Sequence, residues 1–593
     1  MSARKFVPPL VLLAAVLGFY GRALHRPFTS EDFLLIRYLG ENPPWRDVLA
    51  QLSQPWLGIS VVKFFRPVST LLYGIEIAAF GGEPFGYNLV HVLVHTVNAV
   101  LVWTIVRDLV DPDSRFTPLA AALLFAVYPL HPNAVIFSAS FATIFGALFF
   151  LASFAAYQRF RALGSPAAWS ASMGFFLLAL GSYEAAAVLP GVLAVYDHLV
   201  VGRPHRARPA GYLPFFGVLG GYLLFRRWLF GVTIGGYDEY SQRLLAPQIL
   251  RTVEDLATSI YQLHFPVYTR MPGAWAVVVS CAVLVGAPLV FWLVRKGGGD
   301  ARLWLFAWAW ILAAQAPFAF RPSVPGNGRY WYLAAAGAAM GVCFAARGVF
   351  AVIRRPWRSL APAAVGLLGI FWCVLLAGCV GAYVEAGRTA RTIQGELLRV
   401  RPGSQTFLTR YPYFLESEAG VPIAQIYHYG VWDSLQPPFT LERAPVYPLP
   451  PLAGAELLPV ALGSPGSSVY EWDAGKIRRF VPPAGPALQE FQVLGPVDGA
   501  VVSAARDFAE VVVPAGRHVR FRLILSTRIN GAVFDLDPGA VQAGVLRADL
   551  PDEILQTSDR LYGKGLHYWW IEARDASGQV SGFSRMRSFR LRD

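Results

Sequence analysis

The first 385 residues contain eleven long apolar stretches, separated by short polar or charged connections. An α-helix rises about 1.5 Å per residue, so roughly 20 apolar residues cross the ~30 Å hydrocarbon core of a bilayer. We therefore predict a helical membrane bundle of about eleven spans. The predicted spans are 6–24, 86–106, 116–133, 135–157, 167–184, 185–201, 210–230, 273–294, 302–320, 330–347 and 360–384.

Two further segments are moderately apolar and are predicted to lie at the membrane surface or to re-enter it. They are 65–82 and 253–268. A span at 253–268 would move Arg295 and Lys296 to the outer side, against the distribution of the other basic residues. For this reason 253–268 is not counted among the spans, and 65–82 is interpreted in the same way.

The basic residues that flank the spans predict the topology. Short basic runs such as "SARK", "QRFR", "GRPHRARP" and "RRPWR" all fall on one side if the eleven segments cross. Basic residues collect on the cytoplasmic side of membrane proteins. The N-terminus is then inside, where 6–24 acts as an uncleaved first span, because no small-x-small cleavage site follows it. The loop 25–85 and residues 385–593 are predicted to be external.

The C-terminal third has a different pattern. Residues 386–486 show short mixed patterns between proline-rich connections and are predicted to be a mixed α/β or linker region. Residues 487–593 alternate apolar and polar positions, which is typical of strands. Their end, "HYWWIEARDASGQVSGFSRMRSFRL", reads as a strand, a turn and a returning strand, and resembles the last hairpin of a fibronectin type III sandwich. Trp569, Ile571 and Phe589 are the predicted core contributors.

Composition supports a membrane protein and excludes several other classes. Only 15% of the residues are charged, 55% are hydrophobic, and the mean hydropathy is +0.43. The net charge of +13 comes from basic runs at span ends rather than from a basic face with interleaved aromatic residues, so nucleic acid is not expected as a partner. Four cysteines, Cys281, Cys343, Cys373 and Cys379, lie inside apolar stretches and match neither a zinc nor a disulfide spacing.

Ionisable residues near the predicted external ends of the spans are the candidates for chemistry. Charged groups at membrane depth are costly unless they are paired or face water, and they often mark functional sites. The predicted inner face carries mainly basic topology markers, so the asymmetry indicates an external site. Near these ends lie Glu31, Asp32, His131 and Glu184. Further candidates are Arg66 in the first loop, His91 and His95 in the second span, and Arg329 at the start of the tenth.

Each candidate also has a structural alternative. Glu31 and Asp32 could be a solvated helix cap, and His131 could end a helix before a proline. His91 and His95 share a helical face at i, i+4 and could bind a metal. No third ligand is apparent in the sequence, so hydrogen bonding within the bundle is favoured and no metal is predicted.

The order of these residues resembles a known series. "FTSEDFLLIRYL", "FRPVSTLLYGIEIAAFGGEPFGYNLVHVLVHTVNAVLV", "YPLHPNAVIF", "LALGSYEAAAVLPG" and "NGRYWYLAAAG" follow one another as in the C-type membrane glycosyltransferases. The series is similar in particular to the O-mannosyltransferases that carry tetratricopeptide repeats, and to their bacterial relatives. It covers roughly residues 10–385.

Three departures from the family are visible. The acidic pair is Glu-Asp, where relatives commonly have Asp-Asp or Asp-Glu. Tyr183 stands where a lysine is usual. No 34-residue repeat is present, and a β-rich region takes its place.

The resemblance implies a sugar transfer from a polyprenyl-phosphate donor to a protein, glycan or lipid acceptor, without cofactor or catalytic metal. Asp32 is slightly favoured over Glu31 as the general base, because a hydrophobic run follows it directly. Arg66 and Arg329 would bind phosphate, while Glu184 and His131, with His91 and His95, would shape the cavity. The bacterial inner membrane is the expected location, with the C-terminal region on the periplasmic side. A transporter or flippase, and an inactive membrane scaffold, are the alternatives.

Overall fold

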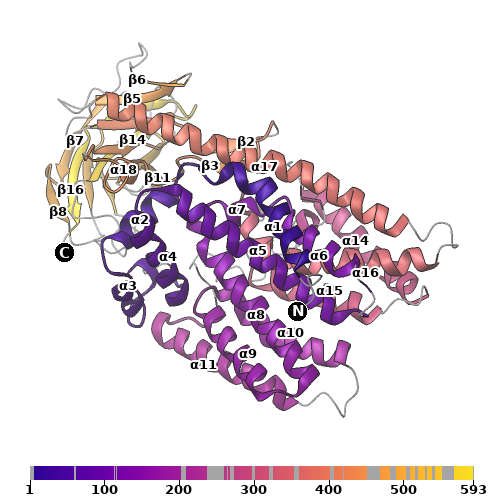
Figure 1. Cartoon of the computed structure of the whole chain (residues 1–593). Helices are drawn as coiled ribbons and strands as arrows, with labels where there is room; N and C mark the ends of the chain where they lie inside the picture. Colours follow the sequence, from indigo (N-terminus) through magenta and orange to yellow (C-terminus); the bar gives the residue numbers. More distant parts are fainter. Residues whose placement is uncertain are drawn as a thin grey trace.

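A helical bundle is followed by a β-rich C-terminal region (Figure 1). The computed structural model describes residues 6–58, 62–111, 114, 116–201, 209–234, 236, 259–263, 265–266, 273–296, 301–318, 325–352, 360–400, 406–418, 420–441, 443–450, 468–473, 475–480, 489–502, 508–514, 518–527, 531–536, 541–549 and 567–591.

The α-helices are α1 (Val7–Tyr20), α2 (Glu31–Gly40), α3 (Pro44–Ala50), α4 (Pro67–Phe80), α5 (Pro84–Leu109), α6 (Phe116–Ala126), α7 (Pro132–Val135), α8 (Phe141–Leu163), α9 (Pro166–Leu180), α10 (Leu189–Tyr196), α11 (Leu213–Phe230), α14 (Gly273–Lys296), α15 (Ala301–Gln315), α16 (Tyr332–Val352), α17 (Leu360–Arg399) and α18 (Val431–Ser434). Short helical turns near the site are η3 (Trp56–Gly58), η4 (Ser138–Ser140), η5 (Glu184–Val188) and η11 (Pro325–Trp331).

Every predicted span contains a helix, and several helices begin at prolines, which lack the N–H group that a first helical turn leaves unbonded. Among the described residues, five helical segments are long and apolar enough to cross a membrane. They are Pro84–Leu109, Ser138–Leu163, Glu184–Val201, Gly328–Val349 and Pro362–Arg399. The chain therefore has the helical region of an integral membrane protein, and the count of eleven spans stays a prediction.

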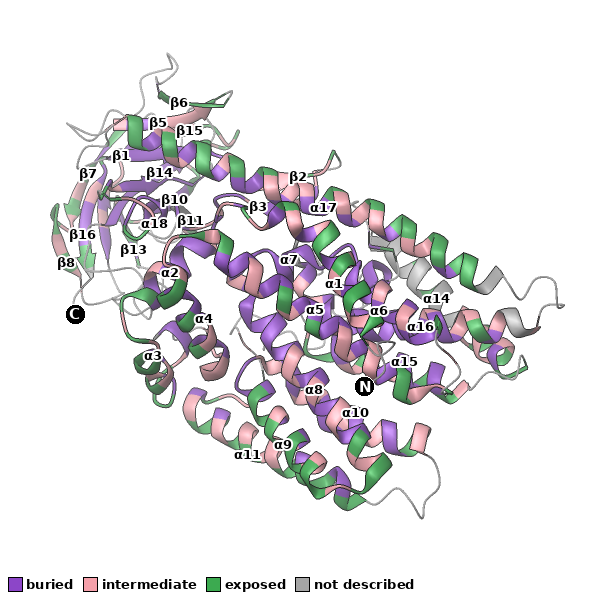
Figure 2. Cartoon of the chain, viewed as in Figure 1, coloured by how far each residue is buried: buried purple, intermediate pink, exposed green. Residues whose placement is uncertain are grey.

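The outer surface of the bundle supports this conclusion. On α17, Leu367, Ile370 and Val374 are each more than 60% exposed and follow one another at helical spacing. Figure 2 shows exposed residues along the outward side of this helix. A long apolar face without protein cover is typical of contact with lipid.

The boundary between two predicted spans differs from the prediction. The sequence pattern placed spans at 116–133 and 135–157, but α6 ends at Ala126 and α8 begins at Phe141. Pro129 and Pro132 interrupt the helical pattern, because proline cannot donate a backbone hydrogen bond. The intervening residues 127–140 form a bent connection whose backbone groups remain available to other residues.

The two segments predicted at the membrane surface are described to different extents. Residues 65–82 contain α4, with Leu71 and Ile75 exposed and Tyr73 and Ile77 buried. Of the segment 253–268, only 259–263 and 265–266 lie within the described residues, and 259–263 are helical. The surface location of both segments stays a prediction.

The C-terminal strands are β1 (Thr406–Thr409), β2 (Phe414–Glu416), β3 (Pro422–Gln425), β4 (Val446–Pro448), β5 (Ser468–Asp473), β6 (Lys476–Arg479), β7 (Gln489–Gly495), β8 (Ala500–Val502), β9 (Ala509–Val512), β10 (Arg520–Ser526), β11 (Gly531–Leu536), β12 (Val541–Gln542), β13 (Val545–Ala548), β14 (His567–Arg574), β15 (Val580–Ser584) and β16 (Arg587–Leu591). A four-stranded sheet has the order β4-β1-β5-β6, and β2 pairs with β3. The strands from β7 onward form a larger sheet system, in which β11-β10-β14-β15-β7-β9-β13-β12 are successive neighbours.

The predicted final hairpin is confirmed as β14 and β15, which pair antiparallel around a turn at Asp575–Gly578. Trp569, Ile571 and Phe589 are fully buried in one apolar cluster, as predicted. The intervening residues of β14, Tyr568 and Trp570, lie in a second cluster shared with the four-stranded sheet. Both faces of this strand are thus buried, and the fibronectin type III-like sandwich stays a prediction.

Candidate functional site

Asp32 is enclosed by the protein. It lies in the first turn of α2 and its side chain has no exposed surface. Its Oδ2 accepts a hydrogen bond from the backbone N–H of Thr29 at 3.0 Å, and its Oδ1 accepts one from the N–H of Ala139 at 2.8 Å. The backbone N–H of Ala139 is available to Asp32 because Ala139 lies in the bent connection between α6 and α8.

A buried arginine completes the surroundings of Asp32. Arg26 Nη1 lies 3.4 Å from Asp32 Oδ2 and donates to the carbonyl of Ile136 at 2.6 Å. Burial raises the pKa of the Asp32 carboxyl, and the Arg26 guanidinium and the two amides oppose this rise. The apolar run Phe33–Ile36 that follows Asp32 is itself buried, which draws this side of α2 into the protein interior.

Glu31 lies on the other side of the same helical turn. Its side chain is 26% exposed, and its Oε2 lies 3.9 Å from Nη1 of Arg329, whose side chain is 18% exposed. This contact joins the acidic pair after the first predicted span to the late "NGRYWY" element. The two side chains carry opposite charges, and both are partly accessible.

Arg329 is positioned by the bent connection between α6 and α8. Its backbone N–H donates to Oδ1 of Asn133 at 3.2 Å, and its Nη1 donates to Oγ of Ser140 at 3.3 Å. A side chain at Gly328 would collide with the carbonyl oxygen of Leu130, so η11 approaches this connection as closely as glycine allows. The bent connection therefore binds both the backbone and the guanidinium of Arg329, which lies next to Glu31.

Arg66 and Glu184, both predicted at the site, bind each other. Glu184 Oε2 accepts hydrogen bonds from Arg66 Nε at 3.0 Å and Nη2 at 2.9 Å. The rings of Phe64, Tyr183 and Trp56 surround this guanidinium, with the Phe64 centroid 3.9 Å from its central carbon. Tyr183, which replaces the usual lysine, thus packs on the neighbouring arginine.

The three predicted histidines are buried in the bundle. His91 Nε2 lies 3.1 Å from Glu76 Oε2, whereas His95 contacts the Tyr332 hydroxyl at 2.7 Å. The ring centroids of His131 and His95 are 5.2 Å apart. Among the described residues, no three His, Cys, Asp or Glu side chains form a cluster suited to a metal ion. The metal-independent site stays a prediction.

A small apolar hollow lies between the two arginine regions. Its cavity volume is about 10 Å³, and both Arg329 and Tyr183 line it. Other residues that line it are Phe150, Phe318, Tyr330 and Leu333. The hollow therefore runs from the guanidinium beside Glu31 toward the ring that packs on Arg66.

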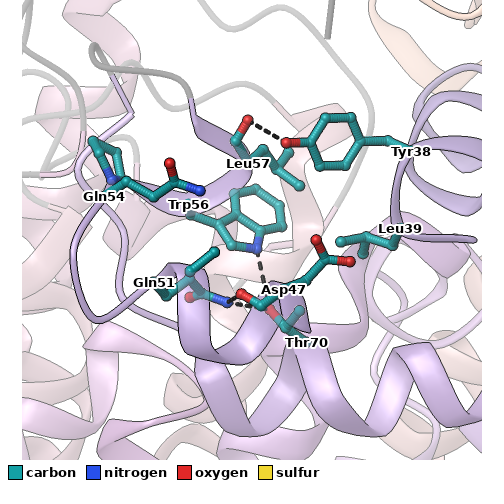
Figure 3. Close-up of a pocket in the computed structure, with 10 residues that line it drawn as sticks. Tyr38, Leu39, Asp47, Gln51, Gln54, Trp56, Leu57 and Thr70 are labelled. Carbon is teal, nitrogen blue, oxygen red and sulfur yellow. Dashed lines mark hydrogen bonds between the residues drawn. The ribbon is translucent and has the colours of Figure 1, made fainter. Parts of the chain in front are cut away.

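A second hollow lies within the loop 25–85 and has a cavity volume of about 10 Å³ (Figure 3). Trp56 Nε1 and Gln51 Nε2 both donate to Oγ1 of Thr70, at 3.2 and 3.0 Å. Gln51 Oε1 accepts the backbone N–H of Arg66 at 2.9 Å. These bonds connect α3 and η3 to the start of α4 and fix the backbone of Arg66. The residues around this hollow therefore hold the loop 25–85 together.

The structure thus brings Glu31 together with Arg329, and Arg66 together with Glu184. Asp32 is adjacent but enclosed, and the histidines lie within the bundle. Sequence reasoning missed Arg26, which lies beside Asp32, and His428, which lies within electrostatic range of Glu31. Arg26 lies in the stretch "HRPF" before the acidic pair, where it resembles a residue that flanks a span, and His428 lies far away in the C-terminal region without a recognisable pattern.

Comparisons with known proteins find relatives of the predicted kind. Protein O-mannosyl-transferase Tmtc1 of Drosophila melanogaster is 36% identical over 145 residues, which cover 24% of this chain and 17% of that protein. TMTC4 of Homo sapiens is 32% identical over 160 residues, covering 24% and 22%, and TMTC3 of Homo sapiens is 28% identical over 138 residues, covering 23% and 15%. The chain is similar to protein O-mannosyl-transferases. The predicted resemblance is confirmed, over less than a quarter of the length of these relatives.

No protein-family model matches the chain. Among solved structures, ArnT from Cupriavidus metallidurans bound to undecaprenyl phosphate has a TM-score of 0.41 and 14% identity, over 79% of this chain and 93% of that chain. The arabinofuranosyltransferase AftD from Mycobacteria has a TM-score of 0.41 and 15% identity, over 88% and 41%.

Proposed function

We propose that this chain is a membrane glycosyltransferase that moves a sugar from a polyprenyl-phosphate donor to an acceptor hydroxyl on a protein, glycan or lipid. The observation that carries the proposal is the pair Glu31–Arg329, a partly exposed carboxylate 3.9 Å from a partly exposed guanidinium. The similarity to protein O-mannosyl-transferases supports the same reaction class.

Glu31 is the proposed general base. A base must reach the acceptor proton, so it needs access to substrate. Glu31 has this access, whereas both oxygens of Asp32 already accept hydrogen bonds inside the protein. This reverses the slight sequence preference for Asp32, because the hydrophobic run that favoured Asp32 also buries it. Asp32 is then a positioning residue for the first turn of α2.

Arg329 is the proposed ligand of the donor phosphate. As the bond between the anomeric carbon and the phosphate oxygen breaks, the phosphate gains charge, which a guanidinium fork stabilises. The donor's polyprenyl chain is proposed to lie against the apolar residues that line the hollow beside Arg329. Arg66 and Glu184, already paired, are proposed to shape the far wall of this hollow.

The site is proposed to be external. A backbone hydrogen bond from Ser30 N–H to the carbonyl of Ile426, 2.9 Å long, joins the loop 25–85 to the C-terminal region. The two regions must therefore lie on the same side of the bundle, as the predicted topology requires. The distribution of basic residues at the span ends favours the periplasm or lumen for that side.

Labelled-sugar transfer tests this function. Purified protein in detergent is given undecaprenyl phosphate that carries radiolabelled mannose or glucose, with the delipidated envelope of cells that lack the protein as acceptor. We expect label to move into the envelope fraction with release of undecaprenyl phosphate. Binding of donor without any transfer, from every donor tried, would contradict the proposal and favour a transporter or a scaffold.

A further inference from the structure

The start of α2 is held by the C-terminal region as well as by the bundle. Ser30 immediately precedes Glu31, and its N–H donates to the carbonyl of Ile426 at 2.9 Å. In return, the N–H of Tyr429 donates to Oγ of Ser30 at 3.0 Å. Residues 426–430, which follow β3, therefore bind both the backbone and the side chain of Ser30.

Ser30 has an unusual backbone conformation. Its φ is 46° and its ψ is −119°, a combination that glycine adopts readily and that a side chain disfavours. Such a conformation persists only where surrounding contacts enforce it, and it is often found at functional sites. Since Glu31 is the next residue, the backbone conformation of Ser30 sets the direction in which the side chain of Glu31 points.

Gly430 allows the close contact that enforces this conformation. Its φ is 80°, and a Cβ at this position would collide with the carbonyl oxygen of Ser30 and lie 3.3 Å from Cβ of Phe33. One residue beyond it, α18 begins, where Asp433 Oδ1 lies 2.5 Å from Nε of Arg37 on α2. The contact is thus fixed at both the first and the second turn of α2.

His428 belongs to the same segment and lies within electrostatic range of Glu31. Burial lowers the pKa of His428, and the negative charge of Glu31 partly opposes this shift. Its ring packs among half-buried aromatic residues, with centroids 4.1 Å from Tyr429, 5.1 Å from Phe414 and 5.8 Å from Tyr413. A neutral imidazole can both donate and accept a hydrogen bond, which suits an acceptor hydroxyl.

We propose that residues 426–430 of the C-terminal region form the acceptor side of the site. In this proposal, which rests on the proposed glycosyltransferase function, the contact of Gly430 with Ser30 positions Glu31, and His428 helps to bind the acceptor next to that carboxylate. The C-terminal region then takes part in acceptor recognition and is more than a docking module.

Gly430→Ala tests the positioning role. The added methyl group pushes residues 426–430 away from Ser30, and the maximal rate of transfer should fall at least tenfold. Gly475→Ala is the matched control: Gly475 also has a positive φ, 84°, in the β5–β6 turn, but no heavy atom lies near its missing Cβ. The two variants share the backbone cost, and only the first disturbs Ser30.

His428→Gln tests the acceptor role and does not depend on the behaviour of the glycine variants. The amount of envelope acceptor that gives half-maximal transfer should rise at least tenfold, while the half-saturating amount of undecaprenyl-phosphate mannose stays unchanged. A purely structural defect would lower the activity without this separation of acceptor from donor. His428→Phe, which keeps an aromatic ring but lacks the two ring nitrogens, should behave like His428→Gln.

The outcomes separate the two proposals. A wild-type protein that transfers no sugar contradicts the proposed function itself. An active wild type with unchanged acceptor dependence in His428→Gln, or with Gly430→Ala as fast as Gly475→Ala, overturns the role of residues 426–430. If Gly430→Ala cannot be purified as a monodisperse protein, the result for His428→Gln decides.

Discussion

The first turn of α2 has an inner side and an outer side that differ in what surrounds the carboxylate. On the inner side, Asp32 is buried against Arg26 and accepts two backbone hydrogen bonds. On the outer side, Glu31 is partly exposed and lies beside Arg329 of the bundle, and the preceding residue, Ser30, contacts residues 426–430 of the C-terminal region. Two adjacent acids therefore have different tasks available to them.

The difference shows how a fold can separate the support of a site from its chemistry. A charge whose oxygens are all engaged contributes to structure, because removing it leaves its partner buried and uncompensated. A charge that keeps access to solvent remains free to exchange a proton with substrate. The arginines show the same contrast, since Arg66 is bound in two places by Glu184 whereas Arg329 has a longer contact with Glu31.

The largest effect is expected from Glu31→Gln. The amide keeps the size of the side chain but cannot take the acceptor proton, so single-turnover sugar transfer should fall by about 10²–10⁴-fold. Donor binding, measured in parallel, should change little. A near-normal rate in Glu31→Gln together with a large loss in Asp32→Asn would reverse the assignment of the two sides.

Asp32→Asn should mainly lower stability. The substitution leaves the Arg26 guanidinium buried beside a neutral group, which destabilises proteins by about 3–5 kcal/mol when a buried ion pair is broken in this way. Unfolding of the detergent-solubilised protein should shift to markedly lower temperature. Arg26→Met combined with Asp32→Asn is the control, because it removes both buried charges and should recover part of the loss.

Sequence reasoning predicted a large part of this arrangement. Hydrophobic length located the helices, and the alternation in "HYWWIEAR" located β14 and its core residues. The acidic pair and Arg329 were both candidates, through the order of the motifs. The contact between Glu31 and Arg329 depends on the bent connection 127–140, whose backbone and side chains bind Asp32 and Arg329. The hydrophobic pattern did not predict this connection, because it assigned most of these residues to the two flanking spans.

Other features carry no local signal. Arg26 is one of many arginines at the end of an apolar stretch, and only the fold shows that it is buried. The contact between Ser30 and residues 426–430 joins segments from opposite ends of the chain, so neither periodicity nor spacing indicates it. The positive φ of Ser30 is likewise imposed by tertiary contacts against the preference of serine.

Arg329→Lys and Arg66→Lys compare the two arginines. An ammonium cannot reproduce the two-point contact of a guanidinium with phosphate. Arg329→Lys should therefore lower transfer by about 10–100-fold, a loss of roughly 1.4–2.7 kcal/mol of transition-state stabilisation. Arg66→Lys should change the rate less, because the Arg66 guanidinium is already bound by Glu184 and packed against the surrounding rings. Equal losses in the two variants would show that both arginines contact the donor.

The smallest effect concerns Glu572, a buried carboxylate in the C-terminal region. Like Asp32 it is enclosed by the protein, and its effect on stability can be measured in a fragment without the helical bundle. Glu572 on β14 is fully buried, with Arg574 Nε 2.8 Å from its Oε1. Burial raises the pKa of Glu572 to about 7, against the nearby charge of Arg522. A free glutamate ionises near pH 4.3. Between these values the folded state therefore binds more protons than the unfolded state, and stability falls as pH rises.

Urea unfolding of residues 401–593 between pH 5 and 8 measures this dependence. This fragment keeps the four-stranded sheet that covers Tyr568 and Trp570, and it should give a β-type circular dichroism spectrum. The free energy of unfolding should fall by at most ~1.4 kcal/mol per pH unit and level off above the folded-state pKa. In Glu572→Gln the side chain stays neutral, so the slope should be lost. A slope that persists in this variant would assign the pH dependence to other groups, and the contrast between buried and accessible carboxylates would then rest on α2 alone.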